Sequence, residues 1–157
     1  PGIYFHSLFG SRGWIDGVKS TGRARTINRE KLQVDSLKDD LSNNESLRNL
    51  VFSGYKALLT ARTSNAAFHP NGEQKVFHLH KGIFSILRTS PDGKTSVICI
   101  HNVQNMRLEV KILLSDLGID QMKNVKDLLS DNIYFVEEDT VKFWIEPYKV
   151  LWLEVEN

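Results

Sequence analysis

The spacing of apolar residues changes near residue 65 and divides the chain into a helical part and a strand-rich part. Before this point, segment 43–62 (NNESLRNLVFSGYKALLTAR) has apolar residues at steps of three and four, the period of an amphipathic helix. Asn43 or Asn44 is expected to cap it, because a short side-chain oxygen can accept from the free N–H groups of the first turn. A shorter helix with a narrower apolar face is expected from Asn28 to Leu41.

After residues 63–74, a connector rich in turn formers, the apolar period falls to two. Asp92-Gly93 predicts a hairpin turn within SPDGK, and segment 116–130 is expected to be a loop with a helical turn. Closely spaced short strands predict an antiparallel sheet or sandwich. The predicted strands are the runs 75–80, 82–89, 95–103, 108–114, 132–138, 141–146 and 149–155.

The first ten residues, PGIYFHSLFG, are interpreted as a buried aromatic strand that enters a glycine turn. A chain that opens within a core element, and without Met, is expected to be a piece of a longer protein. The fold class expected is therefore α+β in two parts. Residues 1–70 hold one strand and helices, and residues 71–157 form an all-β domain.

Composition argues against two classes of partner. Lys and Arg number 20 against 19 Asp and Glu, so the chain lacks the overall basic field typical of nucleic-acid-binding proteins. No apolar run approaches the length that spans a bilayer, and no signal peptide is recognised. Cys99 is the single cysteine, which excludes a disulfide within the chain and favours a reducing, cytoplasmic location.

No complete active site is evident from the residues. Cys99 lies in a predicted strand and is interpreted as a small buried hydrophobe. His78 and His80 stand two apart in another predicted strand, but no further ligand lies at matching spacing, so no metal site is predicted. Neighbouring acidic residues at 39–40 and 137–139 are interpreted as solvated faces, and no phosphate-binding loop motif is present. No cofactor is expected.

The main chemical feature is the basic segment 19–31, KSTGRARTINREK, in which Arg23, Arg25 and Arg29 precede the shorter predicted helix. The planar arginine fork suits bidentate contacts to carboxylates and phosphates. Three interpretations stay open at this point: a solvated loop, a ligand-binding loop and a nucleic-acid contact. The segment lacks the interleaved aromatic residues that would stack on bases.

The order of PGIYFHSLFGS, TGRARTINREKL, LLTARTSNAAFHP and EPYKVLWLE resembles the C-terminal part of sucrose-phosphorylase-like enzymes of the α-amylase family. This resemblance implies the end of a (β/α)8 barrel followed by an antiparallel β domain. Residues 3–5 would be the last barrel strand and residues 6–28 a long loop at its catalytic end. Helices at 29–41 and 44–62 would close the barrel.

By the same resemblance, the enzymes are retaining, with an Asp nucleophile, a Glu acid/base and a second Asp that stabilises the transition state. These residues would lie upstream of Pro1, so the chain would hold no catalytic residue. Arg29 would be the arginine that reaches bound glucose and pairs with an active-site Asp, and Arg25 the earlier member of the R-x-x-x-R pattern. Thr26 stands where some relatives carry an acidic residue.

The leading hypothesis is a C-terminal fragment, inactive alone, of an enzyme that moves glucose from an α-glucoside such as sucrose to phosphate. The partners would be sugar and phosphate, without nucleic acid or membrane. Its β domain would be structural, with Trp144 and Trp152 in the core, and an exposed barrel-facing surface could drive dimerisation. The alternative is an independent carbohydrate- or partner-binding β module with no catalytic parent.

Overall fold

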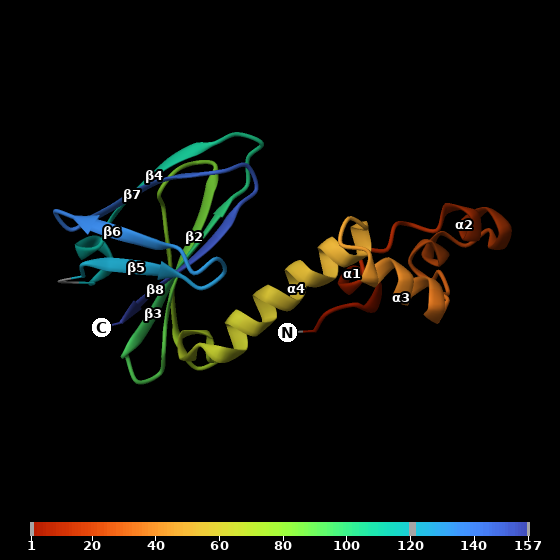
Figure 1. Ribbon diagram of the computed structural model, residues 1–157, viewed down its shortest axis with the longest axis horizontal. Helices are drawn as coiled ribbons and strands as arrows, with labels where there is room; N and C mark the ends of the chain where they lie inside the picture. Colours follow the sequence, from red (N-terminus) through yellow and green to blue (C-terminus); the bar gives the residue numbers. More distant parts are fainter. Residues whose placement is uncertain (1, 120–121, 157) are drawn as a thin grey trace. The chain divides into compact units, whose positions relative to one another are not determined.

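A computed structural model describes residues 2–119 and 122–156 of the chain. The chain forms two compact units, residues 1–59 and 60–157. The first unit is helical and the second is built around a β-sheet (Figure 1). One helix, α4 (Leu47–Ser64), begins in the first unit and ends in the second.

The helical unit consists of short elements before α4. They are α1 (Phe5–Leu8), α2 (Ile15–Thr21), the 3-10 helix η1 (Ala24–Asn28) and α3 (Val34–Ser42). The long helix α4 lies where the apolar period predicted it. Its cap is Ser46 rather than Asn43 or Asn44, because Ser46 Oγ accepts from the N–H of Asn49 at 3.0 Å. Asn43 instead closes the preceding turn by accepting from the N–H of Glu45 at 3.0 Å.

Three further predictions for this unit were wrong. Residues 3–5 form no strand: Tyr4 is extended, the helix α1 begins at Phe5, and a lone strand has no neighbour here to complete its backbone hydrogen bonds. Residues 6–28 are not one long loop, because they contain α1, α2 and η1. The helix expected from Asn28 begins at Val34, since η1 and an irregular stretch occupy the preceding residues. The claim of a barrel remnant therefore has no support from this unit's backbone.

The second unit holds one eight-stranded antiparallel sheet with the order β1-β2-β3-β8-β5-β6-β7-β4. The strands are β1 (Glu73–Phe77), β2 (Ile83–Thr89), β3 (Thr95–Asn102), β4 (Leu108–Leu113), β5 (Asn124–Asp127), β6 (Ile133–Glu137), β7 (Thr140–Ile145) and β8 (Val150–Glu156). All seven predicted strand runs contain a strand. The hairpin turn is confirmed, with Gly93 at φ +73° and its N–H donating to the carbonyl of Ser90. Strand β5 was missed, because segment 116–130 was expected to be a loop.

The C-terminal strand β8 joins the two halves of the sheet. It pairs with β3 on one side and with β5 on the other, so β1–β3 and β5–β7 meet only through it in the sheet order. Asp127, fully buried at the end of β5, reinforces this junction: its Oδ1 accepts from the backbone N–H of Trp152 at 2.9 Å. Its other carboxylate oxygen accepts from the hydroxyl of Ser130.

The core of the second unit lies on one side of the sheet, where alternate residues of most strands meet. Strands β3 and β8 are buried on both faces, which explains their nearly continuous apolar sequences. Their second face is covered by the 3-10 helix η2 (Ala66–Phe68), with the rings of Phe68 and Trp152 4.6 Å apart. The largest fully buried side chains include Ile98, Ile100, Ile112, Leu114, Ile145 and Leu153.

Trp152 is a core residue as predicted, but the same prediction for Trp144 was wrong. Trp144 lies on β7 with 53% of its surface exposed, and the guanidinium of Arg107 lies 5.0 Å from its ring. Along β7, Trp144 alternates with the buried Phe143 and Ile145, so its side chain lies on the outward face of the strand. Within residues 2–119 and 122–156, no helix is both long and apolar enough to cross a membrane.

The helical unit lacks a hydrophobic core of its own. Among the described residues of 2–59, only Gly17 and Thr26 are buried, and no large apolar side chain is. Several large apolar side chains are exposed instead, which is unusual for a unit that folds alone. They are Tyr4, Phe5, Ile15, Ile27, Val34, Leu47 and Leu50.

We expect the substitution Asp127→Ala to lower the free energy of unfolding of the β unit by about 2 kcal/mol, because it leaves the buried N–H of Trp152 without an acceptor. Chemical denaturation followed by far-UV circular dichroism measures this change. Glu137→Ala, at an exposed position of β6, is the control and should alter stability by less than about 0.5 kcal/mol. Equal effects of the two substitutions would contradict the anchoring role of Asp127.

Candidate functional site

The basic segment singled out in the sequence forms an ordered turn between α2 and α3. Gly22, at φ +63°, adopts the left-handed conformation that ends α2 and redirects the chain into η1. The 3-10 helix η1 then carries Arg25, and Arg29 follows directly after it as the residue that ends the helix. Both predicted site residues therefore belong to one short structural element.

Hydrogen bonds from three other parts of the helical unit hold this turn. The N–H of Trp14 donates to the carbonyl of Ile27 at 2.7 Å, and the hydroxyl of Tyr4 donates to the carbonyl of Asn28 at 2.8 Å. Thr26 is buried, and its Oγ1 accepts from the hydroxyl of Thr21 at 3.0 Å. Thr26 thus holds the turn against the rest of the helical unit through its buried hydroxyl. An ionised carboxylate buried at the same position would need other hydrogen-bond donors around it.

Arg25 and Arg29 point in the opposite sense, toward solvent. Both are exposed, and neither side chain makes a hydrogen bond or ion pair with any residue that the structure describes. Arg23 in the same turn is also exposed. The structure places the two predicted residues in one exposed turn, and no second group among residues 2–119 and 122–156 completes a site around them.

The side chain of Trp14 packs directly over Gly17 in α2, and this contact shapes the approach to the turn. A Cβ atom at Gly17 would lie 2.2 Å from the indole ring, closer than any real contact. Gly17 is buried for this reason. The backbone N–H of the same residue, Trp14, donates to the carbonyl of Ile27 in η1.

A separate cavity of about 330 Å³ in the helical unit is lined partly by Arg12, Glu30, Asp40 and Arg48. Arg48, which the sequence did not indicate, has only 19% of its side chain exposed and forms an ion pair with Asp40 at 3.0 Å. It also donates to the carbonyl of Phe9 and the hydroxyl of Ser11, at 3.2 and 3.0 Å. Because these bonds join α1, α3 and α4, Arg48 is a structural residue. Neither Arg25 nor Arg29 lines this cavity.

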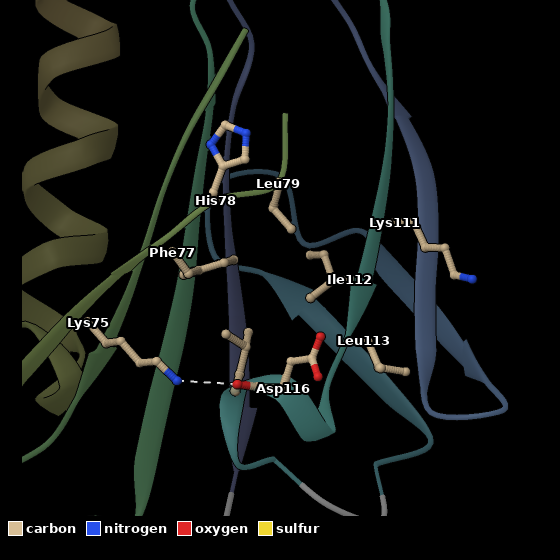
Figure 2. A pocket seen from close by; sticks show the side chains of 9 residues that line it. Lys75, Phe77, His78, Leu79, Lys111, Ile112, Leu113 and Asp116 are labelled. Carbon is tan, nitrogen blue, oxygen red and sulfur yellow. Dashed lines mark hydrogen bonds between the residues drawn. The ribbon is translucent and has the colours of Figure 1, made fainter. Parts of the chain in front are cut away.

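The β unit contains a cavity of about 410 Å³ between the two end strands of the sheet, β1 and β4 (Figure 2). Five of its nine lining residues are apolar and four are polar or charged. One hydrogen bond crosses it, from Lys75 Nζ to the backbone carbonyl of Asp116 at 3.2 Å. Sequence reasoning did not indicate this cavity, because β1 and β4 are not neighbours in the chain or in the sheet. The lining residues are Lys75, Phe77, His78, Leu79, Lys111, Ile112, Leu113, Asp116 and Leu117.

The remaining reactive side chains are placed away from any assembled site. Cys99 is buried, as predicted, and burial raises the pKa of its thiol to about 12. The prediction that His78 and His80 both lie in a strand was wrong: β1 ends at Phe77, and His80 Nδ1 accepts from the N–H of Gly82 at 3.0 Å. Across residues 2–119 and 122–156, no group of three His, Cys, Asp or Glu is arranged to hold a metal ion.

Three curated proteins with the same name are similar to this chain, although no protein-family model matches it. A glucosylglycerate phosphorylase from Spirochaeta thermophila is 39% identical over 98% of the chain and 27% of its own length. The glucosylglycerate phosphorylase of Escherichia coli is 27% identical over 98% of the chain and 25% of its own length. The chain thus spans about a quarter of the relatives it matches over nearly its full length.

Solved α-amylase structures share the fold. AmyP in complex with maltose matches with a TM-score of 0.68 at 17% identity, covering 82% of this chain and 24% of that one. An α-amylase from Anoxybacillus matches with a TM-score of 0.63 at 13% identity, covering 83% of this chain and 25% of that one. At these identities the likeness establishes the fold, and in particular the β-rich C-terminal domain of such enzymes.

We expect Gly17→Ala to displace the Trp14 ring, because the added methyl group would overlap it. In a ¹H–¹⁵N correlation spectrum the indole resonance of Trp14 should move, while those of Trp144 and Trp152 stay in place. Gly54→Ala is the matched control, since nothing lies near its Cβ position in α4. It should leave all three indole resonances unchanged and favour the helix by about 1 kcal/mol. An unmoved Trp14 resonance in Gly17→Ala would contradict this packing.

We also expect Cys99 to resist Ellman's reagent at pH 8 in the folded chain. Its thiol pKa of about 12 keeps it protonated there, and burial blocks access. The same chain in guanidinium chloride should react at the rate of a free thiol, with absorbance at 412 nm as the measurement. Rapid reaction of the folded chain would show that Cys99 is an accessible thiolate.

Proposed function

The chain is homologous to the C-terminal part of α-amylase-family enzymes of the phosphorylase type, and we propose that its full-length protein phosphorolyses an α-glucoside. The relatives are named for glucosylglycerate, which favours this donor over sucrose. In the proposed reaction the bond from the anomeric carbon to the glycerate oxygen breaks, and a bond from that carbon to a phosphate oxygen forms. The glycerate oxygen takes a proton, so the products are glucose 1-phosphate and glycerate.

The role proposed for this chain is to supply Arg25 and Arg29 to the substrate site. The observation that carries this role is their exposure, without partners among the described residues, on a turn that three hydrogen bonds hold in place. Both phosphate and the carboxylate of glycerate are anions, and arginine binds either with two parallel hydrogen bonds. A preformed turn presents the guanidinium groups with little loss of backbone entropy.

The acid, base and nucleophile of a retaining mechanism are proposed to come from the rest of the protein. By family resemblance, Arg29 would contact the glucosyl unit and pair with an active-site Asp, and Arg25 is the earlier member of the same R-x-x-x-R pattern. We propose that Arg25 binds the anionic acceptor, because a guanidinium group binds phosphate or carboxylate with two hydrogen bonds. The 157-residue chain should therefore bind substrate weakly at best and show no turnover. This proposal involves no cofactor.

Exposed apolar side chains in the helical unit support a larger parent. Tyr4, Phe5 and Val34 are each more than half exposed, and burying one such side chain is worth about 2 kcal/mol. Additional protein packed against this unit would recover that energy and complete its core. In the absence of that additional protein, the chain is predicted to self-associate through the same exposed apolar residues.

The β unit is proposed to be structural. It has a complete hydrophobic core, and the predicted arginine residues lie outside it. An independent carbohydrate-binding module would have no need of the helical unit, yet the similarity to the phosphorylases extends over 98% of the chain. That extent favours the enzyme hypothesis over the binding-module alternative.

The test is a phosphorolysis assay of the full-length protein, measuring glucose 1-phosphate from glucosylglycerate and, separately, from sucrose. Arg29→Lys is expected to lower kcat/KM about 100-fold, because lysine cannot reproduce the planar fork at a site of developing charge. Arg25→Lys should mainly raise KM for the anionic substrate. Arg23→Lys, in the same turn, is the matched control and should change kcat/KM less than about threefold.

Two outcomes would contradict the proposal. If neither donor yields glucose 1-phosphate, the proposed phosphorylase activity is refuted. Equal activity of Arg29→Lys and Arg23→Lys would refute the role assigned to Arg29 but not the proposed reaction. Circular dichroism of each variant shows whether a loss reflects folding instead of binding.

A further inference from the structure

The cavity between β1 and β4 lies where the sheet fails to close. Both are end strands, so each has one side without a strand partner. Phe77 and Leu79 from the β1 side and Ile112 from β4 point toward one another across the gap (Figure 2). Leu117 adds a further apolar wall and, like Phe77 and Leu79, packs against the core of the unit.

The polar groups of the cavity have unused hydrogen-bonding capacity. Lys75 Nζ makes one hydrogen bond here, to the carbonyl of Asp116, although an ammonium group has three donors. The carboxylate of Asp116 has no hydrogen bond or ion pair among the residues that the structure describes. Figure 2 shows this carboxylate between Lys75 and Leu113, whereas the amine of Lys111 points away from the other lining side chains.

We propose that this cavity binds a small neutral amphipathic molecule, with its apolar body between the end strands and a hydroxyl-bearing head at Lys75 and Asp116. One hydroxyl would accept from Lys75, and another would donate to the Asp116 carboxylate. A charged head would meet one like and one opposite charge at this pair, whereas hydroxyl groups can both accept from Lys75 and donate to Asp116, so a neutral head is the better match. The site lies outside the arginine turn and does not depend on the proposed phosphorylase activity.

Size and edge chemistry favour a small molecule over an added peptide strand. The volume of about 410 Å³ is within the range of ligand-binding pockets, which are usually apolar with a few polar groups. The strand β1 carries Glu73 and Lys75, both exposed, and charged residues on an end strand oppose pairing with another strand.

The test is a titration of the full 157-residue chain with octyl β-D-glucoside below its micelle concentration, followed by methyl NMR. Saturable shifts of the Leu79, Ile112 and Leu117 methyl groups are expected. Leu47 and Leu50, exposed in the helical unit, report binding to apolar surface elsewhere. Shifts confined to these two residues, or no shifts, would overturn the proposal.

Three further probes separate the contributions of body and head. Decanoate and decylamine keep an apolar chain but carry one charge, and glucose keeps the hydroxyls without the chain. Each charged probe is expected to bind at least about threefold more weakly than octyl glucoside, the loss expected for one hydrogen bond. Glucose is expected to bind more than about tenfold more weakly, because it lacks the apolar chain whose burial favours binding. Equal or tighter binding of a charged probe would overturn the neutral head, and equal binding of glucose would overturn the apolar body.

Substitutions at the polar pair complete the test. Asp116→Asn and Lys75→Met are each expected to weaken octyl glucoside binding about three- to tenfold, because each removes a charge-assisted hydrogen bond. Lys94→Met is the control, since Lys94 is exposed in the hairpin turn and lies outside the cavity lining. Wild-type affinity in both cavity variants would refute the assigned roles of Lys75 and Asp116.

Discussion

The pairing of the C-terminal strand β8 is the interaction on which the β unit depends. Strands β1–β3 form one antiparallel series and β5–β7 another, and β8 lies between them in the sheet. The backbone hydrogen bonds of β8 therefore bring together segments that are far apart along the chain. The buried carboxylate of Asp127 extends this junction by accepting from the N–H of Trp152. Loss of β8 would expose both halves of the core at once.

The helical unit follows a different physical principle, because hydrogen bonds rather than apolar burial organise it. Arg48 joins three helices through its guanidinium, and the turn at η1 is held by Trp14, Tyr4 and Thr21. Net stabilisation from such bonds is modest in water. Such a unit would gain most stability by packing against a neighbouring apolar surface. The exposed side chains of Tyr4 and Phe5 are available for that contact. The same polar framework leaves the arginine side chains free to bind a ligand.

The two candidate sites differ in how much of each this chain contains. The cavity between β1 and β4 is lined by residues of one unit, so this chain supplies both its apolar side chains and its polar pair, Lys75 and Asp116. The arginine turn supplies cations alone, and a catalytic role for it requires groups that the proposed parent would provide. The relatives' greater length is consistent with that requirement, since the chain spans about a quarter of them.

The sequence by itself determined the elements whose signals are local. The three-and-four period predicted α4, alternation predicted seven strands, and Asp92-Gly93 predicted the hairpin, because side-chain direction and backbone preference are properties of neighbouring residues. Only the tertiary structure decided β5, the exposure of Trp144 and the cavity between β1 and β4. Each depends on which segment covers a face or an edge, and apolar burial is set by partners distant in sequence rather than by local pattern.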